Sequence, residues 1–150
     1  MGIELSSEEL NTYMTNTPRI ILCVTRPNRA PLALPMWFGW SDDTIIMRTL
    51  LASKKVGYIR ENPHISCLVE TGEEYFSLKA ALLMGTCEVI DDQTEARELE
   101  KLIYSSKPIY DNLYPKVLPP HLEAFYQQPL AILRMKPTSI TSWDFAKVRR

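Results

Sequence analysis

Three strand-like apolar runs follow one another with only short turns between them, at residues 19–26, 31–40 and 44–49. Sequential strands joined by tight turns indicate an antiparallel meander. Pro31 and Pro35 lie in the second run and cannot donate the hydrogen bonds of a β-ladder. We therefore expect this strand to lie at the edge of a sheet, or to contain a bulge or a bend.

The rest of the chain adds more strands than helices. Apolar runs predict further strands at residues 64–70, 75–90 and 130–135, the last of them continued by 140–145. Helix signals follow Ser6, Ser53 and Asp92, and a shorter one lies within 122–126. About six strands that do not alternate with helices disfavour a parallel doubly wound sheet and predict a mainly β fold, a small antiparallel barrel with peripheral helices. Gly85, in mid-strand, marks a bulge or a close backbone approach, as a curving barrel needs.

Length and composition are those of an ordinary globular protein. The 150 residues have 45% hydrophobic content and a formal net charge of −1, which argues against a disordered or nucleic-acid-binding chain. Cys23, Cys67 and Cys87 lie in apolar runs without metal-binding spacing, so we expect buried thiols in a reducing cytoplasm. No signal-peptide pattern or long apolar run is present, so neither secretion nor a membrane span is expected. We expect one domain over residues 1–150.

A helix is predicted to follow the third strand, beginning at Ser53, and serine is typical of helix N-caps. The first turn of that helix carries Lys54 and Lys55, and the strand before it contains Arg48 and Thr49. Basic side chains are unfavourable at the positive end of a helix dipole, by roughly 0.3–1 kcal/mol each. A bound anion would offset this cost, because backbone N–H groups, ammonium groups, hydroxyls and a guanidinium would converge on it. The pattern predicts a phosphate site, and the alternative is a solvated helix start whose lysines face water.

Trp37, Phe38 and Trp40 form an aromatic set in the second strand, beside the predicted anion site. Because side chains alternate along a strand, Trp37 and Phe38 face opposite sides. One of them can belong to the core while the other borders a ligand; alternatively, the aromatic residues only fill the barrel. A phosphate site next to an aromatic strand suits a flat phosphorylated cofactor.

Residues for most other chemistries are missing from the sequence. The five glycines are too scattered for a dinucleotide-binding or Walker A loop. His64 and His121 lie far apart and in no metal-ligand spacing, so no metal site is predicted. No G-x-S-x-G sequence surrounds a serine. If the protein is an enzyme, a bound cofactor supplies the chemistry and the protein supplies position and electrostatics.

In the order and spacing of its short motifs, the chain resembles the pyridoxamine 5′-phosphate oxidase-like superfamily of FMN-binding split barrels. It is especially similar to the small flavin- or deazaflavin-dependent members. Together the matching segments cover most of residues 18–147. They are residues 24–28, 34–38, 48–49, 53–56, 60–63, 84–92 and 141–147.

The resemblance implies a homodimer of six-stranded antiparallel split β-barrels, with two flavin sites at the subunit interface. The strand that contains Met36 and Trp37 would lie along the flavin ring, partly through backbone groups. Trp143 would reach the ring edge from the partner subunit, and Lys54 either assists or faces water. The cofactor phosphate would be held by four residues, in agreement with the anion site inferred above: Arg48, Thr49, Ser53 and Lys55.

The predicted function is that of a flavin-dependent oxidoreductase, in which FMN exchanges a hydride with a nicotinamide or a small organic substrate. No side chain is assigned as a catalytic acid or base, because flavin chemistry does not require one. Arg29 replaces the usual glycine of the first hairpin, and the C-terminal arginines of true pyridoxamine phosphate oxidases are missing, so vitamin B6 oxidation is not expected. The alternatives are a deazaflavin-dependent reductase, a non-enzymatic carrier of flavin or haem, and a dimeric interaction module with a vestigial site.

Overall fold

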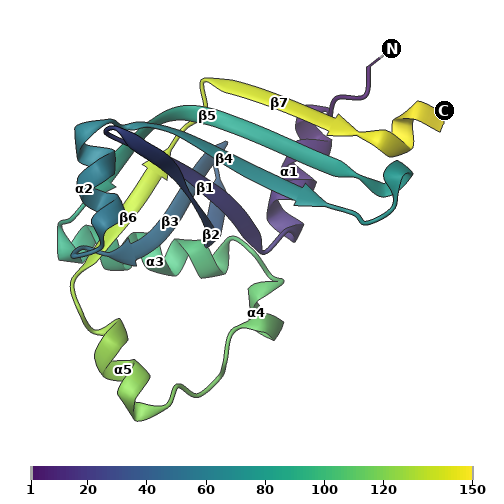
Figure 1. The fold of residues 1–150 in the computed structure, drawn as a ribbon. Coiled ribbons are helices and arrows are strands. Elements are labelled where there is room, and N and C mark those ends of the chain that lie inside the picture. The colour runs from purple at the N-terminus through teal and green to yellow at the C-terminus, as the bar shows by residue number, and fades with distance from the viewer. Residues whose placement is uncertain (1, 150) are drawn as a thin grey trace.

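Within residues 2–149, which the computed structural model describes, six antiparallel strands close into a barrel and a seventh extends one edge (Figure 1). The strands are β1 (Arg19–Arg26), β2 (Arg29–Ser41), β3 (Thr44–Leu50), β4 (His64–Thr71), β5 (Lys79–Ile90), β6 (Leu130–Met135) and β7 (Ser139–Asp144). Their order along the sheet is β4-β1-β2-β3-β6-β5-β7, and pairing of β4 with β5 closes the barrel. The predicted mainly β, six-stranded antiparallel barrel is confirmed.

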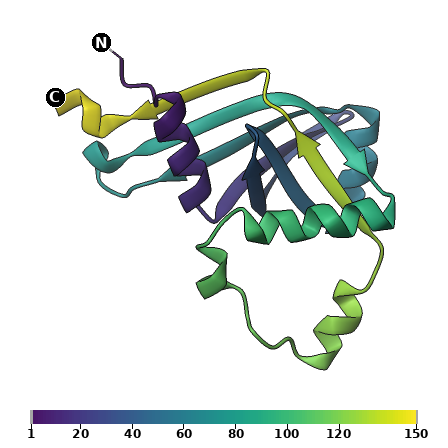
Figure 2. The same cartoon turned by 180° about the vertical axis from the view of Figure 1, so that it is seen from behind.

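Helices lie around the barrel (Figures 1 and 2). They are α1 (Ser7–Asn16), α2 (Lys54–Glu61), α3 (Gln93–Ser105), α4 (Tyr110–Leu113) and α5 (Pro120–Tyr126), with 3₁₀ turns η1 (Tyr75–Ser77) and η2 (Phe145–Arg149). α1 begins with the predicted capping box between Ser6 and Glu9. α3 lies along the outside of the barrel. α4 and α5 are part of residues 106–129, a segment that leaves the barrel and returns to it. We refer to residues 106–129 as the outer segment.

The prolines of β2 lie in the half of the strand that has a neighbour on one side. Up to Trp37, β2 pairs with β1, and its pairing with β3 starts only at Phe38. The first half of β2 is therefore a sheet edge, where residues without an N–H group are tolerated. Of the predicted alternatives for Pro31 and Pro35, an edge strand or a bulge or bend, the structure shows the edge strand.

Gly85 marks a close approach of two backbones. A Cβ atom at this position would lie 2.9 Å from Met135 Sδ and 3.0 Å from the carbonyl oxygen of Lys136. β5 changes its partner here, because residues 79–84 pair with β7 and residues 87–90 pair with β6. The glycine leaves the room that the chain needs to pass from β6 to β7.

Two predicted strand boundaries are wrong. Residues 75–77 form η1 instead of the start of β5, because Ser77 and Glu74 hydrogen-bond each other and close a turn. The last strand does not run on into residues 140–145, since β6 pairs with both β3 and β5 whereas β7 pairs with β5 alone. Pro137, which has no N–H group to donate, lies between the two strands.

Two apolar clusters form the core. One fills the barrel and contains Phe38 and Met47. The other lies between the outer face of the barrel and α3, and contains Ile46 and Ile103. Ile46 and Met47 are neighbours on β3, so the alternation of side chains along this strand separates the two clusters.

The three cysteines are free thiols. Cys67 and Cys87 are buried as predicted, and Cys23 is half-buried. Among residues 2–149, no helix is long and apolar enough to cross a membrane. In the same residues, no group of three or more His, Cys, Asp and Glu side chains is arranged to hold a metal ion.

Candidate functional site

The amine of Lys55 lies between two hydroxyl groups. Its Nζ donates hydrogen bonds of 2.8 Å to Thr49 Oγ1 and 2.8 Å to Ser53 Oγ. Thr49 belongs to the end of β3, Ser53 is the N-cap of α2, and Lys55 lies in the first turn of α2. We term these three residues the lysine cradle. The sequence predicts all three in one site, and the structure brings them together.

The start of α2 is open to an anion. Ser53 occupies the N-cap position as predicted, but its side chain makes no capping hydrogen bond, and its Oγ accepts from Lys55 instead. The first turn of α2 contains no acidic residue. Backbone N–H groups at a helix start, an ammonium and two hydroxyls are the donors that bind a phosphate.

The positive charge of Lys55 has a desolvation cost. Partial burial lowers the pKa of Lys55 below its ordinary value, because the ammonium loses hydrating water. Within residues 2–149, no carboxylate forms an ion pair with Lys55. A bound anion would supply the missing opposite charge.

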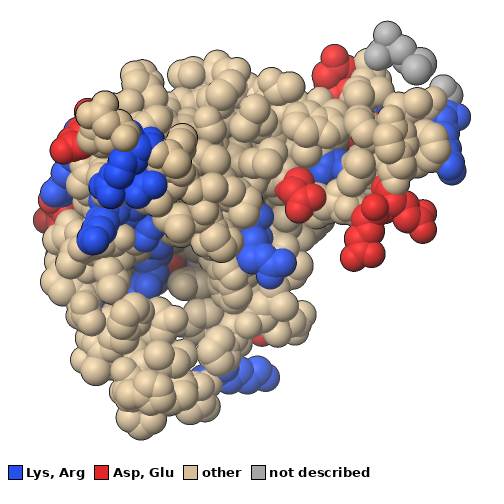
Figure 3. Space-filling view, in the orientation of Figure 1, with Lys and Arg blue, Asp and Glu red and all other residues tan. Residues whose placement is uncertain are grey.

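Two further residues of the predicted site lie outside the cradle: Arg48, a predicted phosphate ligand, and Lys54, predicted either to assist or to face water. The Lys54 side chain is exposed, and Lys and Arg side chains gather over α2 (Figure 3). Arg48 Nε pairs with Glu100 of α3, and its guanidinium carbon lies 4.7 Å from the ring centroid of Tyr126. Because successive side chains alternate across a strand, Arg48 and Thr49 leave β3 on opposite faces. The guanidinium therefore does not join the lysine cradle.

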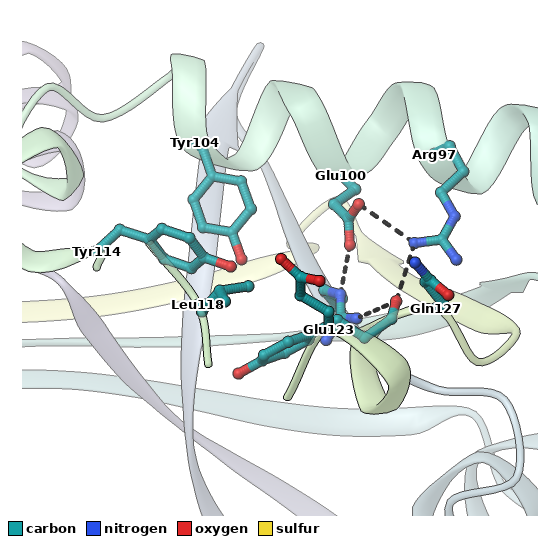
Figure 4. Close-up of a pocket in the computed structure, with 9 residues that line it drawn as sticks. Arg97, Glu100, Tyr104, Tyr114, Leu118, Glu123 and Gln127 are labelled. Atoms are coloured by element: carbon teal, nitrogen blue, oxygen red, sulfur yellow. Dashed lines mark hydrogen bonds and ion pairs between the residues drawn. The ribbon is translucent and has the colours of Figure 1, made fainter. Parts of the chain in front are cut away.

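Arg48 lines a cavity between the barrel and the outer segment. The cavity consists of two adjoining hollows of about 400 and 380 Å³. Figure 4 shows the first hollow, into which Glu100 and Tyr104 project from α3. The outer segment contributes the opposite wall, with Tyr114, Leu118, Glu123, Tyr126 and Gln127.

An ionic network holds the outer segment against the barrel. Glu100 accepts from the guanidinium groups of both Arg48 and Arg97. Both arginines also donate to the carbonyl oxygen of Tyr126, each at 3.4 Å, and Arg97 donates to that of Gln128 at 3.3 Å. These carbonyls lie at the C-terminal end of α5, where positive charge is favoured.

The residues predicted to border a cofactor ring, Met36 and Trp37, face different sides of β2. Trp37 lines the second hollow and stacks on Tyr110, with ring centroids 4.6 Å apart and planes 4° from parallel. Met36 packs against the core of the barrel, where Phe38 is fully buried. The predicted opposition of Trp37 and Phe38 is confirmed, since one borders a cavity and the other belongs to the core.

Within one chain, Trp143 lies far from the lysine cradle. It pairs with Ala80 near the start of β5. At the other end of β5, Ile90 pairs with Ile132 of β6, and Ile132 pairs on its other side with Arg48, the neighbour of Thr49. Positions 80 and 90 are roughly 33 Å apart along a strand that rises about 3.3 Å per residue. One chain therefore does not bring Trp143 to the cradle.

The sequence did not identify the residues of the cavity other than Trp37 and Arg48. Arg97, Glu100, Ile103 and Tyr104 line it from α3, and the remaining walls come from a stretch whose four prolines predicted an irregular connection. Prolines indicate that a segment is a loop but not where it returns to the barrel. The one available signal was the concentration of tyrosines, four of the seven being residues 104, 110, 114 and 126.

Comparison with protein-family models matches residues 6–144 to pyridoxamine 5′-phosphate oxidase. Among solved structures, the conserved hypothetical protein Rv2991 from Mycobacterium tuberculosis has a TM-score of 0.80 at 19% identity, over 99% of this chain and 90% of that one. An FAD-binding protein from Mesorhizobium loti has a TM-score of 0.66 at 18% identity, over 92% and 94% of the two chains. An F420 reductase has a TM-score of 0.64 at 21% identity, over 87% and 94%. No curated protein sequence matches the chain significantly.

Proposed function

The chain belongs to the pyridoxamine 5′-phosphate oxidase family, and we propose that it is a flavin-dependent oxidoreductase. Bound FMN would exchange a hydride with a nicotinamide or a small organic substrate. The protein would position the cofactor and its partner, and the cofactor would supply the chemistry. We further propose a cytoplasmic location, because free thiols such as Cys67 and Cys87 persist in a reducing compartment.

The observation that carries this proposal is the lysine cradle. Lys55 has hydroxyl partners on two sides, is partly buried and lies at an uncapped helix start. In this proposal the FMN phosphate contacts Lys55 Nζ, the hydroxyls of Thr49 and Ser53, and the first N–H groups of α2. A dianionic phosphate would compensate the desolvated ammonium.

The flavin ring would lie along β2, next to Trp37 and the backbone around Met36. Trp37 is already held in place by Tyr110, so it would present a fixed surface. The Arg48 side chain pairs with Glu100 on the face of β3 opposite Thr49. We therefore assign Arg48 to the wall of the cavity and not to the phosphate. Lys54 would remain a solvent-facing charge near the phosphate.

We propose a homodimer in which each partner completes the other's flavin site. In this arrangement Trp143 of one subunit would reach the ring edge bound by the other, since one chain does not bring Trp143 to its own cradle. Exposed apolar side chains on β7, which contains Trp143, and on η1 support an interface there: Ile140 of β7 is 45% exposed and Tyr75 of η1 is 65% exposed. A small-molecule substrate would enter beside the ring.

Titration of the purified protein with FMN tests the proposal. We expect flavin fluorescence to be quenched and the absorbance between roughly 350 and 500 nm to shift on binding. Lys55→Met removes a charge-assisted bond, so affinity should fall about 10- to 100-fold. Lys54→Met is the matched control, and it should change the affinity less than about threefold because Lys54 lies in solvent, where an ion pair contributes little.

Two outcomes would overturn the phosphate assignment. One is a wild-type protein that leaves FMN spectra unchanged. The other is an equal loss of affinity in Lys54→Met and Lys55→Met, which would indicate a general effect of surface charge. Turnover of NADH or NADPH by the FMN-bound protein separates an oxidoreductase from a flavin carrier.

A deazaflavin is the second candidate cofactor. The structural likeness to an F420 reductase favours it, and the basic side chains over α2 would suit a longer anionic tail (Figure 3). Lys54 distinguishes the two cofactors. Lys54→Met should weaken binding of the deazaflavin if its tail runs over α2, and should leave FMN binding unchanged.

A further inference from the structure

The cavity between α3 and the outer segment is built largely from aromatic and aliphatic side chains. Its two hollows share Arg48, Tyr104, Tyr114, Leu118 and Tyr126, so they form one continuous space. The second hollow adds apolar walls from Trp37, Ile103, Leu113, Pro115 and Leu122. Cavities of about 300–1,000 Å³ with apolar walls and a few polar groups are typical of small-molecule sites.

Flat rings form much of the cavity wall. The rings of Trp37 and Tyr114 lie 6.0 Å apart at an angle of 62°, and those of Tyr104 and Tyr114 lie 5.0 Å apart at 60°. Aromatic rings packed at these distances favour further stacked or edge-on rings. A planar conjugated molecule therefore matches this wall better than a flexible aliphatic chain.

Two phenol groups supply hydrogen-bond donors inside the cavity. Tyr104 and Tyr114 turn their hydroxyls into the first hollow (Figure 4). Burial raises the pKa of both phenols above the ordinary tyrosine value. Both hydroxyls are therefore protonated at neutral pH and can donate to an oxygen atom of a ligand.

Three of the four charged side chains of the cavity are already engaged with one another. Glu100 accepts from Arg48 and Arg97, and both arginines also bind the carbonyl of Tyr126. An anionic ligand would have to displace these contacts to find an opposite charge. A cationic ligand would meet Glu123 outside this network, but that side chain is exposed, and an ion pair there contributes little. Burial of a charge without a partner is strongly unfavourable, so the cavity suits an uncharged ligand.

We propose that this cavity binds a neutral, planar aromatic molecule with an oxygen atom that accepts a hydrogen bond from Tyr104 or Tyr114. The assignment of this molecule as the reaction partner of the flavin rests on the proposed function above. Its binding does not depend on the phosphate assignment, because none of the three cradle residues lines the cavity; Trp37 lines it and would also border the flavin ring.

Four naphthalene derivatives of similar shape test the proposal by equilibrium dialysis against the full chain, with and without FMN. 2-Acetylnaphthalene is neutral and has an acceptor oxygen, 2-ethylnaphthalene has none, 2-naphthoate is an anion and 2-naphthylmethylammonium is a cation. We expect the ketone to bind at least tenfold more tightly than either ion and several-fold more tightly than the hydrocarbon. Equal or tighter binding of 2-naphthoate would overturn the proposal.

Two variants separate the cavity from adventitious apolar binding. Leu118→Trp fills the space, so it should weaken both neutral ligands at least tenfold. The double variant Tyr104→Phe and Tyr114→Phe keeps the rings, so it should retain the hydrocarbon and lose the preference for the ketone. Unchanged binding in Leu118→Trp, or an unchanged preference in the double variant, would contradict the proposal, and retained hydrocarbon binding shows that the double variant is folded.

FMN titrations of wild type and Lys55→Met, run beside the dialysis, separate failure of this proposal from failure of the proposed function. If FMN fails to bind wild type while the ketone binds as described, the proposed function is wrong and the cavity assignment stands. If FMN binds through Lys55 while none of the four derivatives binds, the cavity assignment fails alone.

Discussion

Arg48 and Thr49 are consecutive residues of β3, and their side chains lead to different sites. Thr49 Oγ1 accepts a hydrogen bond from Lys55 at 2.8 Å, whereas Arg48 pairs with Glu100 under the outer segment. One strand end thus separates an anion cradle on one face from an aromatic cavity on the other. The two sites share a rigid element of the barrel, which fixes their relative position.

The pair of Arg48 and Glu100 should contribute measurably to stability. Their side chains are only 14% and 22% exposed, so Arg48→Met leaves a partly desolvated carboxylate without its main partner. We expect the free energy of unfolding to fall by about 2–4 kcal/mol, slightly less than for a fully buried pair. Urea unfolding of the variant and wild type at pH 7 measures this change.

An exposed ion pair of the same chain provides the control. Arg60 and Asp91 are joined at 2.8 Å, but both side chains are more than half exposed. Arg60→Met should therefore cost less than about 1 kcal/mol. Equal losses in the Arg48 and Arg60 variants would show that burial does not decide the strength of these pairs.

The sequence was sufficient for features that depend on near neighbours in the chain. The capping box at Ser6, the edge position of Pro35 and the opposite orientation of Trp37 and Phe38 all follow from local geometry. The proximity of Lys55 to Thr49 and Ser53 follows likewise from a strand that turns directly into a helix.

The partner of Arg48 could not be predicted in the same way. Glu100 is 52 residues away along the chain, and only the packing of α3 on the barrel brings the two together. The same holds for Tyr110, whose hydroxyl donates to Phe38 O at 2.9 Å or Pro18 O at 2.6 Å. Contacts of this kind depend on where α3 and the outer segment pack on the barrel, and the residues next to Arg48 or Tyr110 in the chain carry no information about that point.

Two glycines should respond to alanine in opposite directions. A Cβ atom at Gly57, within α2, would meet nothing within 4 Å, whereas one at Gly85 would lie 2.9 Å from Met135 Sδ. We expect Gly57→Ala to stabilise the protein by about 0.5–1 kcal/mol through helix propensity. Gly85→Ala should destabilise it by about 1–3 kcal/mol through overpacking. Thermal unfolding followed by circular dichroism measures both, and a loss of stability in Gly57→Ala would contradict the open environment of that position.

FMN affinity should depend on the protonation of Lys55. Burial lowers the pKa of this amine in the unliganded protein, and a phosphate binds its protonated form. The affinity should therefore begin to fall before the pH reaches the ordinary lysine value of 10.5. Lys55→Arg keeps the charge at all these pH values, so its affinity should stay constant over the same range. Parallel pH profiles for the two proteins, from FMN fluorescence titrations, would exclude Lys55 as the phosphate ligand.

Lys107 should make stability rise with pH. Its side chain is fully buried, its Nζ lies 3.2 Å from the ring centroid of Phe38, and it donates to the carbonyl oxygen of Thr17. Burial lowers the pKa of Lys107 to about 7, while in the unfolded chain it is about 10.4. Between these values the unfolded state binds more protons, so the free energy of unfolding increases with pH, by at most about 1.4 kcal/mol per unit. Below pH 7 both states are protonated, and this gain is absent.

Lys107→Met isolates this effect. The variant keeps an unbranched apolar chain in the same space, so it should lose the rise in stability between pH 7 and about 8, a range below the ordinary cysteine pKa of about 8.5. It should also exceed wild type in stability at pH 6, where wild type must bury the ammonium. Lys101→Met is the control: the Lys101 side chain is 75% exposed, so its removal should leave the pH profile unchanged. Urea unfolding at several pH values compares the slopes, and equal slopes in wild type and Lys107→Met would show that Lys107 does not titrate in this range.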